Sequence, residues 1–197
     1  YAGPAHTGIT SQIEEEIEKV KTPKWLAFDQ AKDRGLVSYY QPKDNYFAHI
    51  DKLIDKNLIK KNSPKIVIDY LYGAGIGYYE SYLGDILDLS ILHNERDPLF
   101  NNLYPDPIEK NLSDLRIKVK KSGADLGIAF DGDADRFGII DEQGIFYSPN
   151  QIASLLLPYL IETRQFKGPV YRTVATTHLL DKITEVFNLP IVKTAVG

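Results

Sequence analysis

An α/β fold with a mixed, mostly parallel sheet is predicted for this 197-residue chain by two features of its sequence. From residue 44 onward, short β-branched runs alternate with amphipathic stretches of helical period, which is typical of strands and helices packed in layers. Only six residues separate the apolar runs 126–130 and 137–141, too few for a parallel crossover, so this pair should be antiparallel. We therefore expect a three-layer α/β/α domain, flanked by incomplete pieces of similar domains.

The first third of the chain indicates a helix, a linker and a second helix. Apolar residues within 13–20 recur at the spacing of one helical face. Residues 22–43 lose this period and contain proline and glycine, which favours a linker. The stretch 44–61 then predicts one amphipathic helix that packs against a sheet. Its apolar stripe consists of Phe47, Ile50, Leu53, Ile54 and Leu58.

The centre of the chain carries the strands of the predicted sheet. Residues 65–70 and 86–92 are apolar runs of strand length, and the helix-compatible stretch 76–83 lies between them. After a loop rich in proline and asparagine, residues 108–123 predict a helix ending at Gly123, where glycine can adopt the left-handed cap conformation. The last two strands of this sheet are expected at 126–130 and 137–141.

The C-terminal quarter repeats the alternation of helix and strand. The expected elements are a helix at 149–164, a strand at 169–175, a helix at 177–188 and a strand at 190–194. Two strands and two helices do not complete such a domain, so we expect a truncated one. Together with the linker, this predicts three parts: 1–42 as the end of one domain, 43–146 as a complete domain, and 147–197 as the start of a third. The absence of methionine also suggests an excised segment.

The composition excludes several classes of protein. A formal net charge of −4 shows no basic excess, so neither nucleic acid nor an anionic membrane is an expected partner. No apolar run approaches the roughly 18 to 20 residues that a membrane-spanning helix needs. The chain has no cysteine, which fits a reducing compartment, and a cytoplasmic location is expected.

Three aspartates, Asp131, Asp133 and Asp135, alternate with small residues in the loop between two predicted strands. Their negative charges would repel one another in the absence of a cation. Ligands that are all oxygen favour Mg²⁺, Mn²⁺ or Ca²⁺ over zinc. Arg136 follows directly and is suited to binding a phosphate that also touches the metal. The loop therefore predicts a metal site for phosphate chemistry.

Other interpretations of this loop stay open. Aspartate and glycine are common in solvated turns, and Asp131, Asp133, Asp135 and Glu142 match positions 1, 3, 5 and 12 of an EF-hand. However, Arg136 stands where an EF-hand needs glycine, and predicted strands flank the loop. An apolar strand followed by Asp-x-Asp also matches the aspartyl-phosphate phosphatases of the haloacid-dehalogenase type, in which Asp131 would be a covalent nucleophile. A non-catalytic module that binds a divalent cation is the remaining alternative.

A glycine-rich turn follows the first predicted strand. Gly73, Gly75 and Gly77 could suggest a nucleotide-binding turn, but their spacing is Gly-x-Gly-x-Gly rather than Gly-x-Gly-x-x-Gly. A tight connection between strand and helix is therefore the favoured interpretation.

Several segments resemble one enzyme family. The stretch GADLGIAFDGDADRFGIID (123–141) resembles the metal-binding loop of the α-D-phosphohexomutases, whose pattern is Asp-Gly-Asp-(Gly or Ala)-Asp-Arg. IVIDYLYGAG (66–75) resembles the first strand and turn of that family's second domain, and LFNNLYPDPIEKNLSDL (99–115) resembles a later segment of it. The flanking GPAHTGIT and VYRTVATTHLLDKI resemble the end of the first domain and the start of the third.

The resemblance implies an enzyme of four domains that moves a phosphoryl group between positions 1 and 6 of a hexose phosphate, through a phosphoserine and a bisphosphate intermediate. Asp131, Asp133 and Asp135 would hold Mg²⁺, and Arg136 would act in catalysis by contacting the phosphate of the phosphoserine. The family's serine motif, Thr-Ala-Ser-His-Asn-Pro, and its sugar loop, Gly-Glu-x-Ser-Gly, are absent from this sequence. We therefore expect the segment to be inactive alone, and nothing in it indicates which hexose is used or which oligomer forms.

Overall fold

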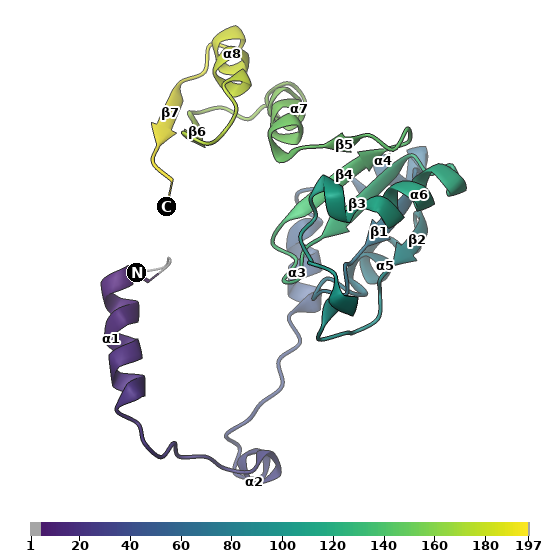
Figure 1. The fold of residues 1–197 in the computed structure, drawn as a ribbon. Coiled ribbons are helices and arrows are strands. Elements are labelled where there is room, and N and C mark those ends of the chain that lie inside the picture. Colours follow the sequence, from purple (N-terminus) through teal and green to yellow (C-terminus); the bar gives the residue numbers. More distant parts are fainter. Residues whose placement is uncertain (1–4, 197) are drawn as a thin grey trace. The chain divides into compact units, whose positions relative to one another are not determined.

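The computed structural model describes residues 5–196 (Figure 1). The chain divides into two compact units, Tyr1–Ala48 and His49–Gly197. A short helix lies within the predicted linker, where no helical period was visible in the sequence. The helices of the N-terminal part are α1 (Thr7–Glu18), α2 (Phe28–Asp33) and α3 (Lys43–Ile50), which ends in the second unit.

A five-stranded sheet forms the centre of the second unit, with strand order β2-β1-β3-β4-β5. β1 pairs in parallel with both β2 and β3, whereas β4 is antiparallel to β3 and to β5. The predicted mixed sheet and its antiparallel pair are confirmed, and β5 is an additional short strand. The strands are β1 (Lys65–Asp69), β2 (Asp88–Leu92), β3 (Leu126–Phe130), β4 (Phe137–Asp141) and β5 (Phe146–Tyr147).

Helices cover both faces of this sheet. Alternate residues of a strand point to opposite faces, so one strand can contribute to two separate buried clusters. Val67 of β1 belongs to a buried cluster formed with α6, whereas Ile66 and Ile68 belong to a second cluster formed with α4 and α5. The predicted three-layer arrangement is therefore confirmed. The covering helices are α4 (Lys56–Asn62), α5 (Tyr78–Leu83) and α6 (Ser113–Ser122).

The single helix predicted over 44–61 is wrong, because the chain breaks there into α3 and α4. The first helix ends at Ile50, and the second begins after Asp55, whose carboxylate accepts the N–H of Leu58 at 3.0 Å and so caps α4. The break also changes the apolar stripe. Ile54 and Ile59 pack against the sheet, whereas Leu58 is exposed.

The C-terminal part holds its own small sheet, in which β6 and β7 pair in parallel. Ser148 and Gln151 form a capping box at the start of the long helix before it. Nothing in this arrangement tests the three-part division into 1–42, 43–146 and 147–197, which stays a prediction. The elements are α7 (Pro149–Glu162), β6 (Val170–Thr173), α8 (Leu179–Val186) and β7 (Ile191–Thr194). Within residues 5–196, no helix has both the length and the apolar character needed to cross a bilayer.

Candidate metal centre

The aspartate loop, residues 131–136, connects the carboxyl end of β3 to the start of β4. The loop closes on itself: the N–H of Ala134 donates to the Asp131 carbonyl at 3.1 Å, and the N–H of Asp131 donates to the Arg136 carbonyl at 3.3 Å. Ala134 adopts a left-handed conformation with φ of 61°. The tight turn brings side chains that alternate in sequence to the same side of the loop.

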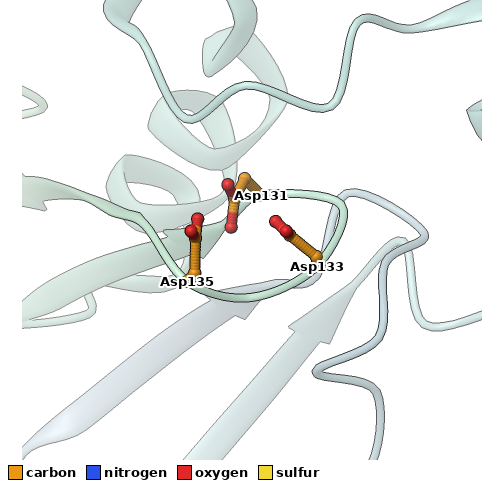
Figure 2. A group of neighbouring side chains, drawn as sticks. All are labelled: Asp131, Asp133 and Asp135. Atoms are coloured by element: carbon orange, nitrogen blue, oxygen red, sulfur yellow. The ribbon is translucent and has the colours of Figure 1, made fainter. Parts of the chain in front are cut away.

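The three aspartate side chains meet at this turn (Figure 2). One carboxylate oxygen from each of Asp131, Asp133 and Asp135 lies within 4.8 Å of the other two. Asp131 is 1% exposed, whereas Asp133 and Asp135 are exposed. The cluster therefore has one buried carboxylate and two carboxylates that solvent can reach.

Arg136 binds the buried carboxylate through two donors. Its backbone N–H donates to Oδ1 of Asp131 at 3.0 Å, and its Nε donates to Oδ2 at 2.8 Å. Its Nη1 donates to Oδ1 of Asp106 at 2.8 Å, while Asp135 lies 3.7 Å from Nε. Among the described residues, no acceptor is placed for Nη2, so this end of the guanidinium is available to an incoming anion.

The electrostatics of the cluster follow from these contacts. Burial raises the pKa of Asp131, but the backbone and side-chain donors of Arg136 outweigh it and hold that pKa below its ordinary value. The pKa of Asp135 is raised, first by its hydrogen bond to Asp131 and then by the negative charge of Asp133. The guanidinium thus compensates the buried carboxylate, while the outer carboxylates still repel each other.

These residues fit a hard divalent cation. Mg²⁺ and Ca²⁺ bind oxygen at about 2.0 to 2.6 Å, so opposite ligands of one ion lie about 4 to 5 Å apart. The separation of up to 4.8 Å between the carboxylate oxygens falls in this range. The raised pKa of Asp135 marks the same crowding of negative charge, which a cation would relieve.

Two further contributors to the site were not identified as such in the sequence. Asp106 lies 25 residues before the aspartate loop and contacts it through the ion pair with Arg136. Ala74, in the glycine-rich turn after β1, donates its N–H to the Gly132 carbonyl at 2.9 Å. Both lie in segments that resemble the family, IVIDYLYGAG and LFNNLYPDPIEKNLSDL, but a contact across the sheet edge has no signature in the sequence.

Comparison with known proteins places the aspartate loop within a described domain. Residues 44–144 match the family "Phosphoglucomutase/phosphomannomutase, alpha/beta/alpha domain II". The chain is 30% identical over 188 residues to a phosphomannomutase/phosphoglucomutase of Pseudomonas syringae pv. tomato, and 34% identical over 155 residues to a phosphoglucomutase/phosphomannomutase of Thermococcus kodakarensis. These matches cover 94% and 77% of this chain.

The fold agrees with the same comparison. A crystal structure from Thermus thermophilus, assigned as a phosphomannomutase, superposes with a TM-score of 0.75 at 27% identity and covers 80% of this chain. The chain spans only 38% and 33% of the lengths of the two curated relatives, and 37% of the Thermus chain.

Proposed function

Because this chain belongs to the α-D-phosphohexomutase family, we propose that it is the metal-binding segment of an enzyme that interconverts hexose 1-phosphates and hexose 6-phosphates. The observation that carries the proposal is the cluster of Asp131, Asp133 and Asp135 at the end of β3, with Arg136 bound to its buried member. In this proposal the three aspartates hold Mg²⁺, and Arg136 contacts the phosphate that approaches the metal.

Each residue has a distinct part in phosphoryl transfer. Bound Mg²⁺ would neutralise charge on the transferring group. Asp131 is the fixed ligand because it is buried and held by two donors, and the exposed Asp133 and Asp135 supply the other two carboxylate ligands. Arg136 is oriented through Nε and Nη1, which leaves Nη2 to donate to a phosphate oxygen.

The aspartyl-phosphate phosphatase is the less favoured alternative. That pattern gives no role to Asp135 or Arg136, whereas here Arg136 donates a hydrogen bond to each oxygen of Asp131 and Asp135 joins the same cluster. Strands β3 and β4 flank the loop, which disfavours an EF-hand. A non-catalytic cation-binding module would use the same aspartates but would have no need of Arg136.

A phosphoserine oxygen would complete the metal site, and this sequence lacks the family's serine motif. We therefore propose that catalysis requires a serine outside these 197 residues and that the chain alone does not turn over hexose phosphates. The substrate is proposed as a class, hexose phosphates, because the loop that reads the sugar in this family is absent from the sequence.

A phosphoserine peptide should strengthen metal binding, because metal and phosphate would share one site. Mn²⁺ is titrated into the chain in the presence of Thr-Ala-Ser-His-Asn-Pro, with the serine either phosphorylated or free. We expect the phosphorylated peptide to raise the Mn²⁺ affinity by about fivefold or more, and the Mn²⁺ to raise the peptide affinity equally. Isothermal titration calorimetry measures both.

The variant Arg136→Gln is the control for the role of the arginine. It removes the guanidinium and leaves all three aspartates, so the chain should still bind Mn²⁺ while most of the gain from the phosphopeptide disappears. An equal gain in Arg136→Gln would contradict the role assigned to Arg136. An absence of any gain in the natural chain would contradict the shared site.

A further inference from the structure

The aspartate loop, which follows β3, is held by the turn that follows β1. Gly73 and Ala74 follow β1, which neighbours β3 in the sheet. The N–H of Ala74 donates to the carbonyl of Gly132 at 2.9 Å. This backbone bond fixes the peptide that links Gly132 to Asp133, because the Gly132 carbonyl is part of it.

Gly73 makes the close approach of these two backbones possible. A Cβ on Gly73 would lie 2.7 Å from the carbonyl oxygen of Asp131 and 2.9 Å from that of Gly132. Both are backbone atoms of the aspartate loop, so a side chain at position 73 could be accommodated only by moving the turn or the loop.

A second loop holds the preceding peptide, which links Asp131 to Gly132. The N–H of Gly132 donates to the carbonyl of Pro105 at 3.1 Å. A Cβ on Gly132 would meet Pro105 at 3.3 Å and the ring of Phe100 at 3.4 Å. Gly132 is therefore fixed through both its N–H and its carbonyl by residues distant in sequence.

The turn itself is anchored to the core. The fully buried Tyr70 accepts the N–H of Tyr79 through its hydroxyl at 3.2 Å and donates a hydrogen bond to Glu80. Its ring also limits the space at Gly75, where an added Cβ would lie 3.2 Å away. Because these contacts hold the turn in place, a side chain added at position 73 would displace the aspartate loop rather than the turn.

We propose that Gly73 is a positioning residue for the metal site: it lets the turn after β1 hold the Gly132 peptide so that the three carboxylates are arranged before the cation binds. This inference rests on the proposed function, since it assumes that the aspartates bind a metal. It gives a role to the glycine-rich turn, whose spacing does not suit a nucleotide. Pre-arranged ligands bind more tightly because less ordering accompanies binding.

The test compares two substitutions of glycine by alanine. Gly73→Ala places a methyl group against the backbone of the aspartate loop, whereas Gly127→Ala places one 2.7 Å from Val119 Cγ2 and 3.0 Å from Leu115 Cδ1, side chains of α6. Both should lower the melting temperature. We expect the Mn²⁺ affinity to fall by about tenfold or more in Gly73→Ala only, and to stay within about twofold of the natural value in Gly127→Ala.

A measurement on the natural chain covers the case in which Gly73→Ala does not fold. With no divalent cation present, amide hydrogen exchange followed by NMR should show the Ala74 N–H strongly protected, because its bond to Gly132 already exists. If this amide exchanges freely and becomes protected only when Mg²⁺ is added, the cation orders the loop and the proposal is wrong.

The outcomes separate this proposal from the proposed function. Unchanged Mn²⁺ affinity in a folded Gly73→Ala chain, with binding lost in Asp133→Asn, would overturn the role of Gly73 alone. If the natural chain binds no Mn²⁺, the metal site itself fails and so does a positioning role toward it.

Discussion

Replacing Asp133 with asparagine is expected to lower the Mn²⁺ affinity of the chain by at least about tenfold, which corresponds to about 1.4 kcal/mol of binding free energy. Asp133 is an exposed member of the aspartate cluster, so its loss removes a charged oxygen ligand without opening a cavity. Asparagine keeps one carbonyl oxygen, and the change therefore tests charge more than shape. Isothermal titration calorimetry with Mn²⁺ and with Mg²⁺ measures the effect.

Asp85→Asn is the matched control. Asp85 is an exposed aspartate that precedes β2, at the opposite end of the parallel strands from the aspartate loop. The substitution changes the net charge by the same amount, so it should leave the Mn²⁺ affinity nearly unchanged. Equal affinities in Asp133→Asn and in the natural chain would contradict the assignment of Asp133 as a ligand.

Replacing Asp69 with alanine is expected to destabilise the folded chain by about 3 kcal/mol, as when one partner of a buried ion pair is removed. Asp69 is 1% exposed at the end of β1. Its Oδ1 accepts the N–H of Leu71 at 2.9 Å and contacts Nδ1 of His93 at 2.8 Å. The alanine would leave both groups without this partner, next to two residues of positive φ, Leu71 and Tyr72. Urea unfolding followed by circular dichroism measures the loss.

The contact between Asp69 and His93 predicts how the stability of the fold depends on pH. The hydrogen bond to Asp69 raises the pKa of His93 above its ordinary value, although burial opposes this. A group with a raised pKa in the folded state stabilises the fold below its unfolded pKa of about 6.5, and the contribution is lost as the pH rises through the folded pKa. The free energy of unfolding should therefore decrease as the pH rises from about 6.5 through the folded pKa of His93.

Asp69→Asn separates the charge from the hydrogen bonds. The amide can still accept the Leu71 N–H, so this variant should be less destabilised than the alanine variant, and the decrease in stability with rising pH should be much smaller. A natural chain whose stability does not change over this pH range would show that the imidazolium of His93 contributes nothing.

Much of the central domain could be predicted from the sequence because its signals are local. The β-branched run at β1 predicts a strand, and the short spacing between β3 and β4 predicts an antiparallel pair. The structure confirms both predictions. Gly123 has a φ of 62° and caps α6 by donating to Val119, as its position after the helical period indicated. The sequence is sufficient where neighbouring residues determine where an element begins and ends.

The errors arose where the signal is tertiary or competes with a stronger pattern. A continuous apolar stripe over 44–61 concealed both the end of α3 at Ile50 and the cap at Asp55, where α4 begins. The aspartate loop was identified from its charges, but its supports were not. Ala74 and Pro105 hold Gly132 through backbone atoms, and a backbone donor or acceptor leaves no trace in residue type.

The position of bound manganese tests the central claim most directly. Crystals of the chain grown with MnCl₂ and measured at the manganese absorption edge should show one strong anomalous peak in the aspartate loop. We expect it about 2.0 to 2.5 Å from oxygens of Asp131, Asp133 and Asp135, since hard cations bind carboxylates at such distances. A peak held by other residues, or none at this loop under conditions where the chain binds Mn²⁺ in solution, would contradict the proposed metal site.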